Sequence, residues 1–271
     1  MSSRRRAVAV VGAAGHVGRH LVGRLEEEDF DVHAVDRGDD LSAAVQSVDA
    51  IVHLAGTLKP VGGDSYRDAN VATVERTLTA ARDAAVRRLV FLSYPGADPD
   101  SSNEYLRTKG EAEALLRLSG IETVILRSTF IFGPPDDPGP SIVPFFAHNG
   151  KPVGVIGSGH QRYQPVFVGD VVRAIIRALD PSIPCATYAL AGPRALTVDE
   201  FVSLLNHGEA GERHLAAPIA KAIALVAPSL TRAMVDVLSA DSVPDAPPAW
   251  GLFGIEPQSL DALYLAGAVS H

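Results

Sequence analysis

The sequence predicts an α/β protein built on a Rossmann-type, doubly wound parallel sheet with a small C-terminal substrate lobe. Short apolar segments alternate with amphipathic helical segments through the first part of the chain. A glycine-rich turn directly follows the first apolar segment, and a proline- and glycine-rich stretch at residues 133–140 ends the regular pattern. A chain of 271 residues, 46% of them hydrophobic, can bury the core that such a fold needs.

Five apolar runs are expected to form parallel strands, because the strands of a sheet covered on both faces are apolar throughout. They are residues 7–11, 32–35, 50–54, 89–92 and 124–126. Between them, apolar side chains recur at the spacing of one helix face, as in the series Val17, Val22 and Leu25 or Val74, Leu78 and Ala81. The alternation predicts a βαβ series.

Two structural parts are expected along the chain. Residues 1–133, joined by part of 160–192, are predicted to form the dinucleotide-binding Rossmann core, and residues 134–160 and 193–271 the substrate-binding lobe. Within the lobe, residues 239–250 are rich in Asp, Ala and Pro and are expected to form an exposed loop.

Charge and cysteine content narrow the classes of partner. The net charge is -8, and no basic run follows residues 4–6, so we expect a small-molecule substrate and no nucleic acid. The sequence has no stretch of eighteen apolar residues that would predict a membrane span. The apolar run after Arg6 is interpreted as a strand and not as a secretory signal. The single Cys185 predicts no disulfide and no metal site, and a cytoplasmic monomer or homodimer is expected.

The turn after the first apolar run has the glycine spacing of a dinucleotide-binding motif. It reads Gly12-Ala13-Ala14-Gly15-His16-Val17-Gly18. Glycines at these positions permit a tight turn and close approach to a pyrophosphate, which would lie at the N-terminus of the following helix. The motif follows a predicted strand, opens a predicted helix and precedes an acidic residue by the usual interval, so NAD(H) or NADP(H) is the predicted cofactor.

The residues after the second strand point to different cofactors. Asp36 can accept both ribose hydroxyls and would repel the extra phosphate of NADP, which favours NAD. Arg37 could instead pair with a 2′-phosphate or stack on adenine. The sequence leans to NAD and leaves both cofactors open.

Tyr105 and Lys109 supply a candidate acid/base pair. They stand four residues apart in a helical segment, so their side chains share one helix face. A nearby cation favours the phenolate form of a tyrosine, which suits the phenol for proton transfer, and the ammonium can also hold the nicotinamide ribose.

With these motifs in order, the chain resembles the short-chain dehydrogenase/reductase superfamily in its extended and atypical branch. It resembles NAD-dependent epimerase/dehydratase, NmrA-like and complex I accessory-subunit-like members. The resemblance implies cofactor contacts from further motif residues along the chain: Asp40, Leu41, Leu54, Ala55, Gly56, Asn70, Ser128 and Phe130.

One position departs from the family pattern. The family ends its fifth strand with two small hydroxyl residues, of which the second binds the substrate oxygen, whereas this chain has Ser93-Tyr94. Either Ser93 or the phenol of Tyr94 would have to orient the substrate oxygen.

Other polar residues are given structural roles. His53 is expected in the core, Glu111 and Glu113 on a solvated helix face, and Asp170 at a helix N-cap. His148 is a second-rank candidate for substrate binding. An apolar substrate is suggested by the residues Phe130, Phe132, Ile142, Phe145, Phe146, Val153 and Trp250, for which core packing is an equal alternative.

The predicted function is a ketoreductase or dehydrogenase that acts on a carbonyl or secondary alcohol of a largely apolar small molecule. The abundance of Arg and Ala suggests a tailoring enzyme of bacterial secondary metabolism. The alternatives are an epimerase/dehydratase-like enzyme for nucleotide sugars and a non-catalytic NAD(P)-binding regulator or subunit.

Overall fold

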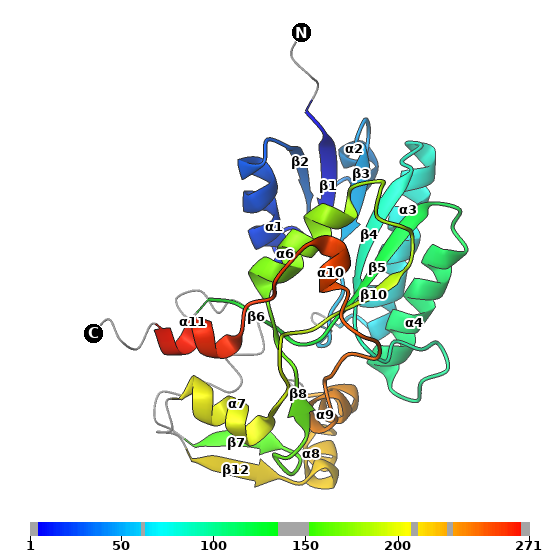
Figure 1. Cartoon of the computed structure of the whole chain (residues 1–271). Coiled ribbons are helices and arrows are strands. Elements are labelled where there is room, and N and C mark those ends of the chain that lie inside the picture. The colour runs from blue at the N-terminus through cyan, green and yellow to red at the C-terminus, as the bar shows by residue number, and fades with distance from the viewer. Residues whose placement is uncertain (1–4, 61–62, 135–151, 207–210, 227–229, 267–271) are drawn as a thin grey trace.

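A six-stranded parallel sheet forms the centre of the computed structural model, which describes residues 5–60, 63–134, 152–206, 211–226 and 230–266. The strand order is β10-β5-β4-β3-β1-β2 (Figure 1). The strands are β1 (Ala7–Val11), β2 (Asp31–Val35), β3 (Ala50–His53), β4 (Arg88–Ser93), β5 (Glu122–Ser128) and β10 (Thr187–Leu190). The predicted fold class and its five strands are confirmed.

Helices cover both faces of the sheet. One apolar cluster joins the sheet to α1 (His16–Glu27), α6 (Val168–Ala178) and α10 (Trp250–Phe253). A second cluster joins the other face to α3 (Thr73–Asp83) and α4 (Glu104–Arg117), with the short α2 (Leu41–Ala44) at its edge. Side chains of β1 alternate between the clusters, with Val8 and Val10 in the first and Ala7 and Ala9 in the second. Both faces are buried, which explains why the strands are apolar throughout.

The chain changes direction across the sheet at β1. Strand β1 pairs with β2 on one side and with β3 on the other. The turns after β1 and β3 therefore meet at the carboxyl edge of the sheet. Ligands of open α/β sheets bind at such a switch point.

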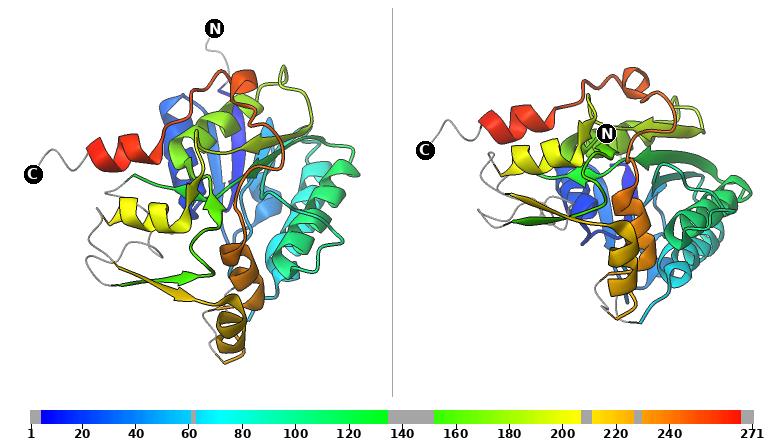
Figure 2. Two further views of the ribbon diagram at one scale, coloured as in Figure 1. Left: turned by 60° about the horizontal axis from the view of Figure 1, so that its bottom comes forward. Right: turned by 90° about the horizontal axis from the view of Figure 1, so that it is seen from below.

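A smaller lobe lies against the carboxyl edge of the sheet (Figures 1 and 2). It is built from short strand pairs and helices, and its core packs the buried Phe132, Tyr163 and Phe201. Its strands are β6 (Ile131–Phe132), β7 (Val153–Ile156), β8 (Arg162–Tyr163), β9 (Val166–Phe167), β11 (Leu196–Thr197) and β12 (Glu212–Leu215). Its helices are α7 (Val198–Leu205), α8 (Ala217–Ile223), α9 (Arg232–Ser239) and α11 (Leu260–Ala266).

Most of the apolar residues considered for a substrate serve the core. Trp250 packs with α6, and its indole Nε1 donates to the Ala191 carbonyl at 2.8 Å. Phe132 and Val153 are fully buried in the lobe. Core packing is therefore the correct interpretation of these three side chains. Ile142, Phe145, Phe146 and His148 lie outside the described residues.

The N-cap expected at Asp170 is wrong, because Phe167 caps α6 and Asp170 is the third residue of the helix. Its fully buried carboxylate accepts from the Gln258 amide at 2.6 Å and from Arg173 at 2.5 Å. It thus attaches the C-terminal segment to α6.

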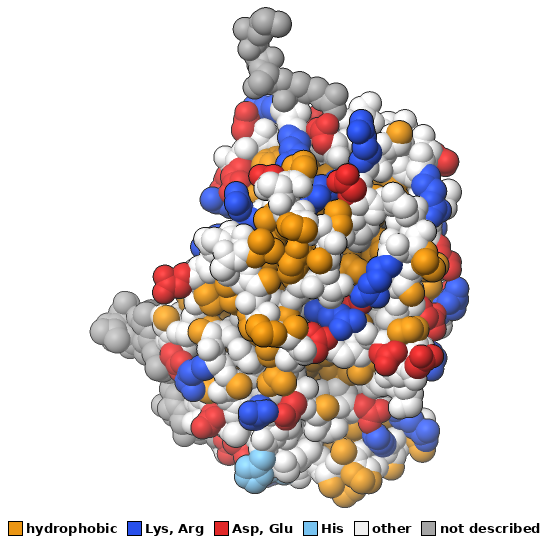
Figure 3. All heavy atoms as spheres, turned by 45° about the vertical axis from the view of Figure 1, so that its right-hand side comes forward, with side chains coloured by type: hydrophobic (Ala, Val, Ile, Leu, Met, Phe, Trp, Pro, Cys, Tyr) orange, Lys and Arg blue, Asp and Glu red, His pale blue; other side chains and the backbone are white. Residues whose placement is uncertain are grey.

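The surface carries mixed charge. Lys and Arg side chains are interspersed with Asp and Glu over the face in Figure 3. Within the described ranges, no helix has the length and apolar character to cross a bilayer.

Candidate functional site

A cavity of about 640 Å³ opens at the carboxyl edge, where the sheet meets the lobe. Its walls come from the turn after β1, the ends of β3, β4 and β5, and helices α4 and α9. The lining residues are Gly12, Gly15, His16, Val17, Gly18, Leu54, Gly56, Thr57, Leu58, Lys59, Leu92, Ser93, Tyr94, Tyr105, Lys109, Ser128, Thr129, Phe130, Ile131, Met234 and Leu238. The glycine-rich turn and the Tyr105–Lys109 pair thus share one cavity.

The glycine turn is too closely packed for larger residues. Gly12 has a φ of 89°, and a Cβ there would lie 2.8 Å from the Ala55 amide nitrogen. A Cβ on Gly18 would lie 2.2 Å from the Gly12 carbonyl oxygen. Gly15 is the N-cap of α1 and offers no side chain to the first-turn amides, so these donors face the cavity mouth and fit the pyrophosphate of a dinucleotide.

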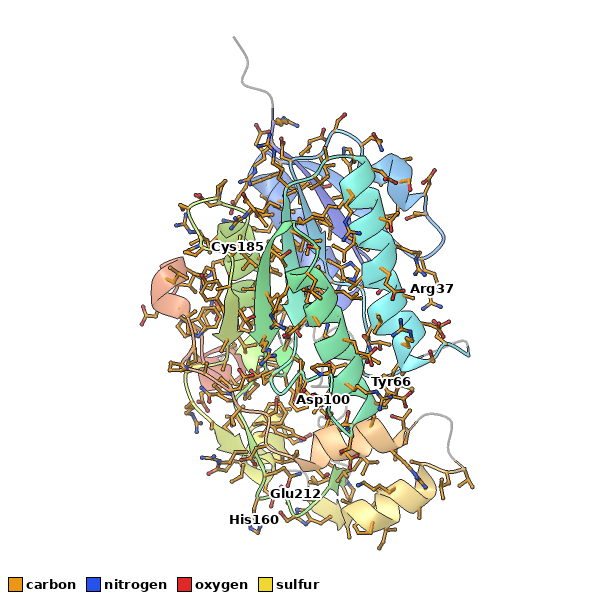
Figure 4. All side chains as sticks on the ribbon, turned by 90° about the vertical axis from the view of Figure 1, so that its right-hand side faces the viewer. Arg37, Tyr66, Asp100, His160, Cys185 and Glu212 are labelled. Carbon is orange, nitrogen blue, oxygen red and sulfur yellow. The ribbon has the colours of Figure 1, made fainter. Side chains whose placement is uncertain are left out.

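The residues expected around the adenosine lie beyond the cavity wall. The Asp36 carboxylate accepts from the Ala14 amide at 2.8 and 3.1 Å, which places it beside the glycine turn. Arg37 forms an ion pair with Asp64 at 2.8 Å and lies at the surface (Figure 4). Asp40 caps α2 by accepting from the Ala43 amide.

Leu41 packs on the second apolar cluster. Like Asp36 and Arg37, Asp40 and Leu41 do not line the cavity that the glycine turn shares with Lys109.

Lys109 is held by backbone and aromatic contacts. Its Nζ donates to the Leu92 carbonyl at 2.7 Å and lies 4.2 Å from the centre of the Phe91 ring. Burial lowers the pKa of Lys109 to about 8, against an opposing effect of the Glu113 carboxylate. The amine is therefore mostly protonated at neutral pH and loses its proton near pH 8.

Tyr105 is the second residue of α4, and the side chain of the N-cap residue Asn103 accepts from the Tyr105 and Leu106 amides. Its ring lies 5.7 Å from that of Tyr94 and 6.3 Å from that of Tyr66. Burial, and then the neighbouring Tyr94 and Tyr66, raise the pKa of Tyr105 above its usual value. The phenol consequently holds its proton and is a weaker acid than a free tyrosine, the opposite of the shift expected from the Lys109 cation.

The structure separates the two candidates for the substrate oxygen. The Ser93 hydroxyl donates to Glu113 Oε1 at 2.6 Å, so its proton is committed to a buried carboxylate. The Tyr94 hydroxyl lies beside Tyr105 and donates to Ser242 Oγ at 2.7 Å. Burial raises the pKa of Tyr94, with a smaller opposing effect of Ser242. Both hydroxyls thus have an acceptor within the protein: a buried carboxylate for Ser93 and the Ser242 hydroxyl for Tyr94.

Glu113 was expected on a solvated face, and this expectation is wrong. Its side chain is fully buried and binds Ser93, Arg117 and Arg127. Only Glu111 is partly exposed, at 30% of its side chain, and it pairs with Arg67 at 2.9 Å. Sequence spacing could not reveal the burial of Glu113, because Ser93 and Arg127 come from two neighbouring strands.

Asn70 fixes the segment that follows β3. It lies in the π-helix η1 (Asp68–Ala72), and its Oδ1 accepts from the Thr57 amide at 2.9 Å. Its Nδ2 donates to the Thr57 carbonyl and to Thr108 Oγ1, both at 3.2 Å. Gly56 has a φ of 148°, and a Cβ there would meet Asn70 Oδ1 at 2.8 Å. Asn70 thus shapes the cavity wall through hydrogen bonds to the backbone.

His53 is buried, as expected. Its ring nitrogens contact Thr77 Oγ1 at 3.0 Å and the Ala55 carbonyl at 3.1 Å. Burial, followed by the charge of Lys109, lowers the pKa of His53 to about 3. The ring is therefore neutral at physiological pH.

Ser128 and Phe130 line the cavity at the end of β5. The Ser128 hydroxyl donates to the Thr129 carbonyl at 3.1 Å, and the Phe130 ring lies 4.8 Å from that of Tyr163. Sequence reasoning missed the lining residues Thr57, Leu58, Lys59, Leu92, Thr129, Ile131, Met234 and Leu238. The position of Thr57–Lys59 directly after the motif Leu54–Gly56 was a usable signal, whereas α9 is distant in sequence.

Comparison with known proteins identifies the relatives of this chain. The model of the "NAD dependent epimerase/dehydratase family" matches residues 8–185. Subunit 9 of the mitochondrial NADH dehydrogenase (ubiquinone) 1 alpha subcomplex from Arabidopsis thaliana is 27% identical over 229 residues, which cover 72% of this chain and 56% of that protein. The 2-alkyl-3-oxoalkanoate reductase of Stenotrophomonas maltophilia is 28% identical over 191 residues, or 60% of this chain and 57% of that protein. The chain thus spans just over half the length of these curated relatives.

Solved structures share the fold. MoeE5 in complex with UDP-glucose and NAD has a TM-score of 0.74 at 21% identity, with 97% of this chain and 100% of that chain covered. UDP-glucuronic acid 4-epimerase from Bacillus cereus has a TM-score of 0.75 at 18% identity, with 96% and 97% covered. The expected resemblance is confirmed, and the NAD dependence in the family's description confirms the expected cofactor class, NAD(H) or NADP(H).

Proposed function

The chain belongs to the NAD dependent epimerase/dehydratase family, and we propose that it is a ketoreductase or dehydrogenase within that family. Its substrate is a carbonyl or secondary alcohol group on a largely apolar small molecule. The observation that carries the proposal is that Tyr94, Tyr105 and Lys109 line the same cavity as the glycine-rich turn.

The chain's own residues fit the cofactor. The tight glycine turn and the uncapped first turn of α1 would hold the pyrophosphate, Asp36 the adenosine ribose and Lys109 the nicotinamide ribose. When bound, the nicotinamide supplies the two-electron oxidation or reduction of the substrate carbon.

The remaining chemistry is proton transfer and positioning. In carbonyl reduction, the Tyr105 hydroxyl, which burial keeps protonated, donates its proton to the substrate oxygen as negative charge develops there. The Nζ of Lys109, held by its bond to the Leu92 carbonyl, supplies a positive charge in the wall of the same cavity. The Tyr94 hydroxyl orients the same substrate oxygen in the role that a small hydroxyl residue has in the family pattern.

The cavity wall supports an apolar substrate. Leu54, Leu58, Leu92, Phe130, Ile131, Met234 and Leu238 make up its apolar part, and among the described lining residues there is no carboxylate. Such a wall favours a hydrophobic carbonyl compound over a sugar nucleotide, whose hydroxyl groups need many polar partners.

The test is reduction of a panel of apolar ketones, followed at the nicotinamide absorbance. Tyr105→Phe should lower kcat by about 100-fold or more, the usual contribution of a general acid, and leave cofactor binding intact. Tyr188→Phe is the matched control, because the Tyr188 hydroxyl donates to the Pro184 carbonyl outside the cavity. Equal turnover by wild type and Tyr105→Phe would refute the acid role.

A second candidate is a non-catalytic dinucleotide-binding subunit. The bond from Tyr94 to Ser242 favours it, because the phenol is already satisfied without a substrate. Some relatives are named as subunits of NADH dehydrogenase. Stoichiometric cofactor binding without turnover across the ketone panel would support this candidate and reject the reductase.

A further inference from the structure

We propose that Asp64 is a specificity-determining residue that makes the dinucleotide site select NAD(H) over NADP(H), by holding Arg37 in an ion pair. The inference rests on the dinucleotide site of the proposed function and is independent of the reaction that follows. Asp64 belongs to none of the sequence motifs and does not line the cavity.

The position of Arg37 is set by Asp64. Arg37 lies two residues after β2, and its Nη2 lies 2.8 Å from Asp64 Oδ2. Asp64 follows β3, so this pair joins the segments after β2 and β3, the two neighbours of β1 in the sheet. The Arg37 side chain is 70% exposed and that of Asp64 is 29% exposed. The guanidinium that a 2′-phosphate would require is therefore already paired with a carboxylate.

Three further acidic residues lie close to Arg37 along the chain. Asp36 accepts from the Ala14 amide, Asp39 accepts from the Asp36 amide at 2.8 Å, and Asp40 caps α2. These three carboxylates accept from backbone amides, whereas the Asp64 carboxylate is paired with the Arg37 guanidinium.

The ion pair between Arg37 and Asp64 affects the binding of NAD(H) and NADP(H) differently. In this fold the adenosine ribose binds beside the acidic residue at the end of the second strand. The ribose of NAD presents two hydroxyls as donors to such a carboxylate, whereas a 2′-phosphate brings about two further negative charges. Arg37 can offset these charges only if it leaves Asp64, and its departure would leave the Asp64 carboxylate without this ion pair.

The experiment is fluorescence titration of NADH and NADPH at low ionic strength, where surface charges are least screened. Wild type should bind NADH about tenfold or more tightly than NADPH, a difference within reach of a few charge contacts. Asp64→Asn, which keeps the side-chain size, should tighten NADPH binding about fivefold and change NADH binding less than twofold.

Two further variants separate the explanations. In Asp64→Asn/Arg37→Ala the gain for NADPH should disappear, because the freed guanidinium is its source. Asp29→Asn is the matched control: it also removes one exposed carboxylate from an arginine pair, with Arg5 at 2.6 Å, but it precedes β2 at the opposite edge of the sheet. It should change neither affinity.

The outcomes distinguish this inference from the proposed function. If wild type binds neither dinucleotide, the proposed function fails. If wild type binds NADPH as tightly as NADH, or Asp64→Asn leaves the ratio of the two affinities unchanged, the role of Asp64 is overturned while the dinucleotide site stands.

Discussion

Replacing the buried Glu113 by Gln should destabilise the protein far more than any surface change on the same helix. The Glu113 carboxylate accepts from Ser93 Oγ at 2.6 Å, from Arg127 Nε and Nη2 at 2.9 and 2.8 Å, and from Arg117 Nη2 at 2.6 Å. Removing one partner of a buried ion pair costs about 3–5 kcal/mol, because the remaining charge is left uncompensated. Asp245 still lies 2.5 Å from Arg127 Nη1, so we expect the lower end, about 3 kcal/mol.

Urea unfolding followed by Trp250 fluorescence provides the assay. Trp250 is the single tryptophan and is buried against the first apolar cluster, so its emission reports loss of the core. With a slope of about 3 kcal/mol per M, the upper part of the usual urea range, Glu113→Gln should lower the unfolding midpoint by about 1 M.

Glu111→Gln is the control for this experiment. It lies on the same helix and pairs with Arg67 and Arg107 at the surface, where such pairs contribute at most about 1 kcal/mol. Equal midpoint shifts for the two variants would refute the assignment of Glu113 as a buried ionic centre.

Three other predictions concern pH and the glycine turn. The pKa of Lys109 is about 8 in the folded protein and 10.5 in the unfolded chain, so the unfolded state binds more protons between pH 8 and pH 10.5. The contribution of this group to the free energy of unfolding should therefore rise by about 3 kcal/mol over that range. Lys109→Met should remove the rise in urea titrations. The His53 pKa of about 3 lies below its unfolded value of 6.5, so stability should fall as pH drops from 6.5 toward 3, and His53→Phe should show a weaker acid dependence in thermal melts. Gly18→Ala should abolish NADH binding in the fluorescence titration, because the added Cβ would overlap the Gly12 carbonyl. Gly23→Ala on the same helix is the control, because no atom lies within 4 Å of a Cβ added there. This control should retain NADH binding and gain about 0.5–1 kcal/mol of stability.

The parallel sheet was predictable because burial on both faces leaves a continuous apolar run. The runs at 7–11 and 50–54 match β1 and β3 to within one residue. Strand β10 was not predicted as a strand, since its pairing with β5 brings together residues that lie about sixty positions apart along the chain. The two-residue strands of the lobe are too short to show any period.

Local spacing also decided which part of the site could be predicted. Tyr105 and Lys109 are one helical turn apart, so the helix alone brings them together. The Arg37–Asp64 pair depends on two separate segments meeting at one edge of the sheet, and no spacing along the chain encodes such a meeting. Glu113 likewise receives its partners from β4 and β5.

The lobe is coupled to the site through the segment that carries α9. Tyr94 donates to Ser242 just after α9, and the Tyr66 hydroxyl lies 2.6 Å from that of Thr231 at the N-cap of the helix. These bonds place Met234 and Leu238 in the cavity wall opposite the glycine turn. The Tyr94 hydroxyl has one proton to donate, so a substrate oxygen that accepts it must displace Ser242 as the acceptor. Binding of the substrate oxygen therefore competes with the hydrogen bond that holds the segment after α9. If Tyr94 has the proposed role, it would therefore link the reacting oxygen to the part of the cavity wall that α9 supplies.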